Sequence, residues 1–311
     1  MHLSFRTLEY IVTTADTGSV TEAARQLNVS QPSVSSAIAH MEAELGAQIF
    51  IRHHARGMTL TVAGRRFVGE ARLLLNHARE FGRNALALGD SLAGGITVGS
   101  FVTLATRFMP GLLAEFSQRM PGIMVNLEEG NQKEILDGLV SGRFEMALSY
   151  AYALTEEVAG ELLAELPPYV LVSAEHPLAG RADVSLSELA NEPFILLDLP
   201  HSREYFFNLF LICKIEPRIV YRSHSYELIR GLVGHGHGYT IHNAVPGTTF
   251  GYDGTRISVL PIRELLPPVQ VMSLSLRRHT LRPAAQKFAD YLREAFAPGG
   301  LYGVPVPAKN P

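Results

Sequence analysis

The stretch GSVTEAARQLNVSQPSVSSAIAHMEAELG, residues 18–46, contains two helical patterns separated by a break of about three residues. Ser19 and Glu22 have the spacing of a capping box, and Asn28 tolerates the left-handed backbone that ends a helix. Ser30 is a second N-cap candidate, and Pro32 follows in the first turn, where its missing N–H is not needed. The sequence therefore predicts a helix-turn-helix motif. The expected apolar faces are Val20, Ala23, Ala24 and Leu27 in the first helix and Val34, Ile38, Met41 and Leu45 in the second.

Three further segments surround this motif. Residues 5–16 predict a preceding helix, because their apolar side chains fall on one helical face. Two β-prone runs, 48–51 and 58–61, flank a charged tip closed by a glycine and predict a hairpin wing. Residues 62–92 have apolar positions spaced three and four apart, which predicts one long amphipathic helix.

Beyond residue 94, β-prone and helical segments alternate along the chain, which is typical of parallel βαβ units. Residues 297–311 are rich in Gly and Pro and are expected to form a flexible tail. The expected strands are 95–100, 123–130, 144–150, 169–173, 194–197, 218–222, 239–242 and 269–276, and the expected helices are 101–119, 131–142, 203–212, 225–234 and 282–296.

Composition narrows the class of protein. A hydrophobic content of 47% with 18% charged residues belongs to a globular chain. The single cysteine, Cys213, excludes an internal disulfide and suits the cytoplasm, and no apolar run reaches the roughly 20 residues that span a bilayer. The N-terminus lacks the layout of a secretory signal, so we expect a cytoplasmic protein without membrane contact.

Charge alone does not indicate a nucleic-acid partner. The net charge is −3, and residues 1–92 carry nine arginines against eight acidic residues. Any contact with DNA must therefore come from the local placement of a few arginines and polar side chains.

The stretch LEYIVTTADTGSVTEAARQLNVSQPSVSSAIAHMEAELGAQIF, followed by TLTVAGRRF, resembles the LysR-type transcriptional regulators. The resemblance covers the whole chain, and it depends most on the SQPSVS, ELG and LTxAG motifs. It implies a sequence-specific DNA-binding regulator controlled by a small, carboxylate-bearing co-effector, with no cofactor and no enzymatic activity. The implied parts are a winged helix-turn-helix domain (1–61), a linker and dimerisation helix (62–93), a two-lobed α/β effector domain similar to periplasmic binding proteins (94–296, with lobe I about 94–165 and 268–296 and lobe II about 166–267) and the tail.

Three stretches depart from the family pattern. Ser36-Ala37 stands where the family often has Arg-Gln, which removes a cation from the expected reading surface. The wing tip RHHARG contains two histidines, which would make its DNA affinity respond to pH. The stretch VGHGHGYTIHNAVP replaces a more apolar Gly-x-Gly segment.

The polar side of the helix that begins after Ser30 predicts contact with base edges, because such a helix fits the major groove. The alternative is a solvated face with capping serines. Arg52 and Arg56 of the wing are expected to hold phosphates or enter the minor groove, against the alternative of ordinary surface charge. The DNA-binding candidates are Gln31, Pro32, Ser33, Ser35, Ser36, Arg52, His53 and Arg56.

The long helix is too apolar to stand alone in water. Packing against a twin helix would bury its apolar stripe, and the alternative is docking on its own domain. A homodimer, or a tetramer built from dimers, would bind near-palindromic double-stranded DNA, with RNA polymerase as a candidate further partner. The stripe consists of Phe67, Ala71, Leu74, Leu75, Ala78 and Phe81.

In the effector domain, Ser100 ends a strand and Thr103 falls in the first turn of the next helix, a junction suited to binding an anion. The alternative is simple N-capping by Ser100. The resemblance likewise implies an effector between the lobes near this turn. The effector-binding candidates are Ser100, Phe101, Thr103, Ser149, His201, Arg203, His224 and His242.

Metal binding and catalysis have little support in the sequence. His224, His235, His237 and His242 lie within nineteen residues, but no HExxH or cysteine pair accompanies them, so we expect no metal site. No GxSxG, P-loop or CxxC motif occurs. The remaining rivals are a nonspecific architectural DNA binder and an enzyme or transport receptor built on the two-lobed domain.

Overall fold

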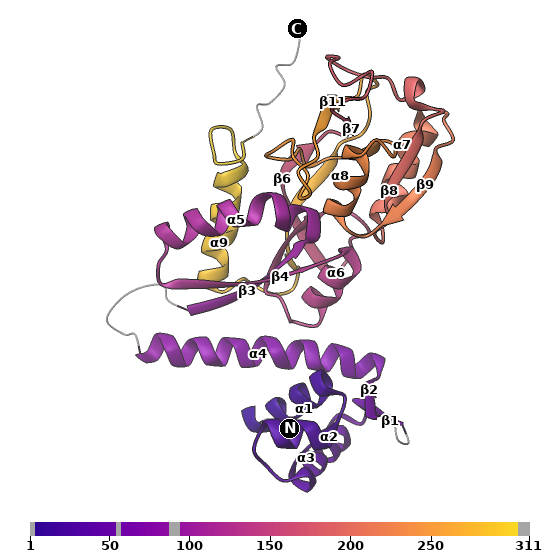
Figure 1. Ribbon diagram of the computed structural model, residues 1–311. Helices are drawn as coiled ribbons and strands as arrows, with labels where there is room; N and C mark the ends of the chain where they lie inside the picture. Colours follow the sequence, from indigo (N-terminus) through magenta and orange to yellow (C-terminus); the bar gives the residue numbers. More distant parts are fainter. Residues whose placement is uncertain (1–3, 54–56, 87–93, 304–311) are drawn as a thin grey trace.

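The computed structural model describes residues 4–53, 57–86 and 94–303. Figure 1 shows three parts in chain order: a small helical domain, the long helix α4, and a larger α/β body whose first lobe faces α4. None of the described helices is both long enough and apolar enough to cross a membrane.

The N-terminal domain consists of α1 (Phe5–Thr17), α2 (Val20–Gln26) and α3 (Gln31–Leu45), followed by a hairpin of β1 (Phe50–His53) and β2 (Gly57–Leu60). Both predicted N-caps are confirmed: Ser19 accepts from the backbone of Glu22, and Ser30 accepts from that of Ser33. The reciprocal half of the expected capping box is wrong, because the carboxylate of Glu22 accepts from Arg25 instead. Asn28 has a φ of 53°, the left-handed conformation expected between the two helices. The expected faces of α2 and α3 form the core of the domain, except that Leu45 is 36% exposed.

The 25-residue helix α4 (Val62–Leu86) packs its middle against α1. Leu8 of α1 contacts Ala71 and Leu75, so the domain itself buries two positions that the sequence assigned to a twin helix. Leu74 and Phe81 remain 45% and 76% exposed. The alternative, in which the long helix docks on its own domain, is therefore correct for one edge of the apolar stripe. The other edge remains exposed. The expected end of the helix, residues 87–92, lies outside the described residues.

Lobe I contains a five-stranded sheet in the order β4-β3-β5-β12-β6, covered by α5 (Val102–Arg119), α6 (Gln132–Val140) and α9 (Pro283–Phe296). β3 is parallel to β4 and β5, but β12 is antiparallel to β5 and β6, so a purely parallel arrangement is wrong. β6 was not expected, because its sequence VAGELLAEL is rich in helix formers, and pairing with β12 overrides that preference. The strands are β3 (Gly94–Phe101), β4 (Ile123–Gly130), β5 (Met146–Tyr150), β6 (Val158–Leu166) and β12 (Val269–Leu276).

Lobe II contains an antiparallel sheet in the order β10-β7-β11 and a parallel pair, β8-β9, joined by the bridge between Phe194 and Tyr239. Two helices, α7 (Ser202–Ile212) and α8 (Tyr226–Gly234), pack on it, and η1 (Leu186–Leu189) is a short 3-10 turn. β11 was also not expected from the sequence. The strands are β7 (Tyr169–Ser173), β8 (Pro193–Leu197), β9 (Arg218–Ser223), β10 (Thr240–His242) and β11 (Ile257–Pro261).

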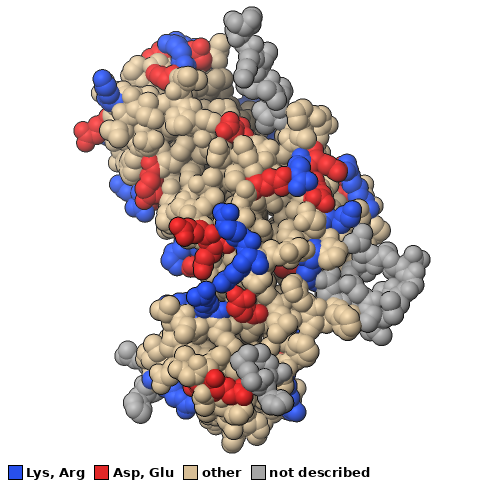
Figure 2. All heavy atoms as spheres, turned by 180° about the vertical axis from the view of Figure 1, so that it is seen from behind, with Lys and Arg blue, Asp and Glu red and all other residues tan. Residues whose placement is uncertain are grey.

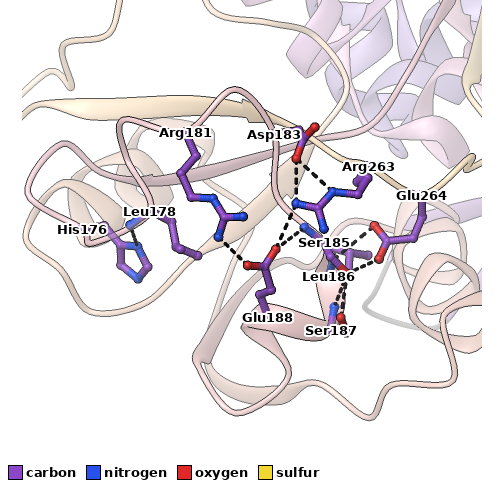
Figure 3. Close-up of polar contacts among 10 residues, drawn as sticks. All are labelled: His176, Leu178, Arg181, Asp183, Ser185, Leu186, Ser187, Glu188, Arg263 and Glu264. Carbon is purple, nitrogen blue, oxygen red and sulfur yellow. Dashed lines mark hydrogen bonds and ion pairs between the residues drawn. The ribbon is translucent and has the colours of Figure 1, made fainter.

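The loop between β7 and β8 is held by a polar network on the outside of lobe II (Figure 3). Glu188 accepts from the backbone of Ser185 at 2.9 Å and pairs with Arg181, and these contacts lower the pKa of its carboxyl. Arg263 joins the network through two hydrogen bonds to Asp183, of 3.0 and 2.8 Å. None of these residues lines either of the pockets described below, so the network is structural.

Residues 297–303, which follow α9, are packed against the effector domain. The backbone N–H of Tyr302 donates to the carbonyl of Ala295 at 2.7 Å, and the Tyr302 ring packs on Phe108, with ring centroids 4.9 Å apart. The expected flexible tail is therefore wrong for 297–303, because an aromatic side chain anchors it. The expectation for 304–311 falls outside the described residues.

Helix α4 also touches lobe I. Glu70 lies 3.0 Å from Arg278 and 3.3 Å from His279, and Figure 2 shows positive and negative side chains side by side around the narrow middle of the molecule. Gly69 and Gly142 allow the two backbones to approach closely: a Cβ on Gly69 would lie 2.6 Å from the carbonyl oxygen of Val140. The position of the N-terminal domain relative to lobe I thus depends on contacts of α4.

Candidate DNA-binding surface and interlobe pocket

The N-terminal end of α3 presents a polar surface. Val34, Ile38 and Met41 are fully buried, which turns the opposite side of the helix outward. Gln31, Pro32, Ser33 and Ser36 are exposed there, and Ser35 is half-buried. The hydroxyls of Ser30 and Ser33 lie 2.8 Å apart, so the side chain of Ser33 is partly engaged in the cap. The structure therefore brings the five helix candidates together at one end.

The wing lies beside α3 and is tied to it by a residue that the sequence analysis missed. The carboxylate of Glu42 accepts from the backbone N–H of Ile49 and of Phe50, at 2.8 and 3.0 Å. Arg52 is exposed on β1, and the ring of His53 pairs with the hydroxyl of Thr59 at 2.8 Å. Arg56 lies outside the described residues. Glu42 thus fixes the wing relative to α3. No local pattern in the sequence indicated this contact.

Two pockets lie between the lobes. The inner pocket is a cavity of about 20 Å³, which is room for one water molecule. Its lining combines lobe I residues from the ends of β3 and β5 and the start of α5 with lobe II residues from α7, α8 and the ends of β8 and β10. The lining residues are Phe101, Thr103, Tyr150 and Tyr152 from lobe I and Leu197, Ser202, Phe206, Tyr226, His242, Asn243 and Ala244 from lobe II.

Aromatic rings fill most of the inner site. Tyr150 contacts Phe101 and Tyr152, with ring centroids 4.9 and 5.3 Å away, and Tyr152 reaches across to Tyr205 of lobe II at 6.0 Å. Burial raises the pKa of Tyr150 and Tyr152 and brings that of Tyr205 to about 12. Because the phenols stay neutral, the lobes meet across a largely uncharged aromatic surface.

His242 is the buried imidazole of this site. It is 3% exposed, and its Nε2 has no hydrogen-bond partner among the described residues. Burial, assisted by the nearby charge of Arg230, lowers its pKa to about 3. Arg230 itself is held by Glu227 at 2.8 Å and by two backbone carbonyls. The site therefore presents a neutral imidazole with one unsatisfied nitrogen.

This neutral state predicts a pH effect on stability. The pKa of His242 is lowered in the fold, so the unfolded chain binds the extra proton, and stability falls as the pH drops from about 6.5 towards 3. From about pH 7.5 to pH 5 the free energy of unfolding should fall by about 2 kcal/mol more in the wild type than in His242→Phe. Urea unfolding of both proteins at each pH measures this difference, and parallel curves would contradict it.

The outer pocket is larger, about 370 Å³, and lies at the carboxyl ends of β3, β4, β8 and β9. Two carboxylates, Glu129 and Glu134, line it together with the imidazole of His224. Glu134 also caps α6 by accepting from the backbone of Asn131 at 2.8 Å. The remaining lining residues are Val102, Gly130, Asn131, Leu199 and Pro200.

Four of the eight effector candidates line these pockets: Phe101, Thr103 and His242 the inner one and His224 the outer one. The other four do not. Ser100 is fully buried and does not cap α5, whose N-cap is Phe101; the hydroxyl of Ser149 donates to Gln132 at 2.8 Å. His201 is exposed at the start of α7, and Arg203 pairs with Asp198 at 3.0 Å.

The two chain segments that connect the lobes are bridged beside the inner pocket. Both contain Leu-Pro-Pro, at residues 166–168 and 266–268. The amide of Asn243 donates to the carbonyl of Leu166 at 3.0 Å and to the hydroxyl of Tyr205 at 2.9 Å. That hydroxyl in turn donates to the carbonyl of Pro267 at 2.9 Å. Asn243, which lines the pocket, is therefore hydrogen-bonded directly to one connecting segment and through Tyr205 to the other.

The described residues contain no group of three or more His, Cys, Asp and Glu side chains arranged to hold a metal ion. His235 instead lies 3.2 Å from Asp253, and His242 is buried among aromatic rings. The site is thus defined by rings, neutral polar groups and two carboxylates.

These features define a protein with a winged helix-turn-helix domain and a two-lobed binding domain. Residues 5–65 match the family described as bacterial regulatory helix-turn-helix protein, lysR family, and residues 89–297 match the LysR substrate binding domain. The chain belongs to the LysR family of transcriptional regulators, which confirms the resemblance and the fold class predicted from the sequence.

Individual proteins of known sequence or structure are similar to this chain over nearly its whole length. The structure of HinK, a LysR family transcriptional regulator from Pseudomonas aeruginosa, is 39% identical, with 94% of this chain and 98% of that chain covered and a TM-score of 0.64. A full-length OxyR variant from Pseudomonas aeruginosa is 26% identical over 94% of this chain and 95% of that chain, with a TM-score of 0.74. The uncharacterized HTH-type transcriptional regulator YybE of Bacillus subtilis is 29% identical over 95% of this chain and all of its own length.

Proposed function

We propose that this regulator binds a specific near-palindromic DNA site through α3 and the wing, under the control of a small molecule bound between the lobes. The observation that carries the proposal is the exposed polar end of α3, held beside the wing by Glu42. Its parts would be residues 1–61 for DNA, 62–93 for pairing and 94–296 for the effector. Action on DNA places it in the cytoplasm, and its ligand is bound rather than turned over.

Gln31 is the strongest candidate for reading a base. Its amide pairs in two-point fashion with adenine when the first turn of a helix enters the major groove. Arg52 stands on the neighbouring strand, where a guanidinium binds phosphate or the narrow minor groove. Ser33, Ser35 and Ser36 would add hydrogen bonds to phosphates or bases.

The open edge of α4 supports a homodimer. Leu74 and Phe81 are seven residues apart, so they lie on one side of the helix, and both remain exposed after α1 has covered the other edge. A second copy of α4 would bury them and hold two recognition helices on one DNA molecule. Tetramer formation and contact with RNA polymerase are proposals that extend this arrangement.

Control by a ligand would act through the two segments that connect the lobes, at residues 166–168 and 266–268. A ligand between the lobes favours one lobe arrangement only to the extent that it binds that arrangement more tightly. Asn243 and Tyr205 connect the inner pocket to both connecting segments, and Glu70 connects lobe I to α4. A change in the relative arrangement of the lobes would therefore alter the spacing between the two α3 helices of a dimer. A carboxylate ligand stays a prediction, and the pocket chemistry favours another class, argued below.

Gln31→Ala is expected to weaken binding to the upstream intergenic DNA by about tenfold or more, because it removes a two-point base contact. Arg52→Ala should weaken binding to all DNA and reduce its salt dependence. Mobility-shift titrations measure both, with the exposed Gln118→Ala and Arg218→Ala in the effector domain as matched controls. Unchanged affinity in Gln31→Ala would remove α3 from the base contacts.

The same titrations separate the rivals. Equal affinity for unrelated DNA would indicate a nonspecific architectural binder, and a footprint over two half-sites one helical turn apart is expected for the dimer. A footprint over a single half-site would contradict pairing through α4. Release of a product from a bound ligand would identify an enzyme.

A further inference from the structure

We infer that the interlobe site takes an uncharged planar aromatic ligand, with a hydrogen-bonding group that pairs with Nε2 of His242, rather than a carboxylate. This inference rests on the proposed function, because it names the chemical class of the effector. It follows from the lining of the inner pocket, the unpartnered nitrogen in it and the charges around it.

The walls of the inner pocket are aromatic on both lobes. Tyr150 and Tyr152 come from lobe I, whereas Tyr226 and His242 come from lobe II and lie 4.7 Å apart between ring centroids. The free space holds one water, so a six-membered ring enters only when the lobes separate. The ligand would then stack on these rings in place of the aromatic contacts between the lobes. Because the surfaces that it meets are aromatic rings, a flat aromatic molecule is favoured.

His242 supplies an unsatisfied polar atom. Its Nε2 is buried and unpartnered among the described residues, and a buried polar group without a partner is destabilising. The imidazole is neutral because its pKa is far below the physiological range. It therefore offers a neutral hydrogen bond and no charge that would neutralise a carboxylate.

The charges around the two pockets disfavour an anionic ligand. Among the described residues, neither pocket is lined by a lysine or arginine, and the outer pocket carries Glu129 and Glu134. The arginines around the site have other partners: Arg203 pairs with Asp198, and Arg107 donates to the carbonyl of Val245 at 2.7 Å. Arg230, the arginine whose charge reaches His242, is paired with Glu227 at 2.8 Å. A buried carboxylate without a paired cation loses its hydration without compensation.

Three probes of similar size test the inference on the full-length protein: benzamide, benzoate and cyclohexanecarboxamide. Benzamide is expected to bind with a Kd in the millimolar range, as a ligand of its size allows. Benzoate and cyclohexanecarboxamide should bind at least about tenfold more weakly, because the first carries a charge and the second lacks an aromatic face. Calorimetry measures all three affinities. Benzoate binding as tightly as benzamide, or no binding of benzamide, would overturn the inference.

Two variants locate the bound ring. His242→Phe keeps a ring but removes Nε2, and it should lower the affinity for benzamide by about fivefold to tenfold. His237→Phe makes the same change at an exposed imidazole that lines neither pocket, and it should leave that affinity unchanged. A loss of affinity in His237→Phe with none in His242→Phe would place the ligand elsewhere. The wild-type probe series stands even if His242→Phe does not fold.

The failure of this inference is distinguishable from failure of the proposed function. If benzamide binds selectively but leaves DNA affinity unchanged, the ligand class stands and the regulatory role fails. If DNA binding is sequence-specific but benzoate is preferred, the regulator stands and the ligand class is overturned.

Discussion

Arg282→Met is expected to destabilise the effector domain by about 3–5 kcal/mol, because it leaves the buried carboxylate of Glu145 without its cation. The side chains of Arg282 and Glu145 are 6% and 7% exposed, and the guanidinium pairs with the carboxylate through two nitrogens. It also donates to the carbonyl of Gly95 at 3.0 Å. This pair therefore ties the start of α9 to the beginnings of β3 and β5.

Urea unfolding followed by circular dichroism measures the effect, and two variants control it. Arg282→Met combined with Glu145→Leu removes both charges and should restore most of the stability. Arg293→Ala breaks an exposed pair with Glu161 and should change stability by about 1 kcal/mol or less. Equal effects of Arg282→Met and Arg293→Ala would contradict the argument.

Gly64→Ala is expected to destabilise the N-terminal domain by about 3 kcal/mol and to lower DNA affinity with it. A Cβ at this position of α4 would lie 2.0 Å from the carbonyl oxygen of Ile49, which is backbone and has little room to move. Relief of that clash requires α4 to shift away from the base of the wing. The carbonyl of Ile49 also accepts from the backbone of Thr61 at 3.0 Å, so the shift breaks a connection into the helix.

Gly82→Ala is the matched control on the same helix. A Cβ there meets no other atom of the described residues within 4 Å, so the higher helix propensity of alanine should make the change neutral or stabilising by up to about 1 kcal/mol. Hydrogen exchange of residues 5–60 reports the local stability of the N-terminal domain. Equal protection in both variants would show that the close approach at Gly64 is not maintained in solution.

Local signals in the sequence determined the helix-turn-helix and the outline of the effector domain. Ser19, Asn28 and Ser30 act through hydrogen bonds and backbone preferences that span only a few residues. The alternation of segments after residue 94 was equally local, and most strands and helices lie where it predicted them. For the same reason the family motifs identified the fold.

Tertiary structure decided what depended on partners far along the chain. The sequence VAGELLAEL became β6 because β12 pairs with it, and Ala71 and Leu75 turned to α1 because Leu8 lies there. No pattern within a few residues of the sequence indicates which side chains at the end of a strand face the opposite lobe. Ser100 and Ser149 were therefore expected in the effector site, whereas Tyr150 and Tyr152 line it.

The division between what the sequence determines and what the tertiary structure decides has a physical cause. Caps, turns and helical periodicity are set by interactions within one or two turns of chain, so the amino-acid sequence alone determines them here. The pairing of Glu145 with Arg282, the link from Glu42 to the wing and the aromatic interlobe site join residues on separate elements. Their contacts exist only once sheets and helices have packed, so only the tertiary structure decides them.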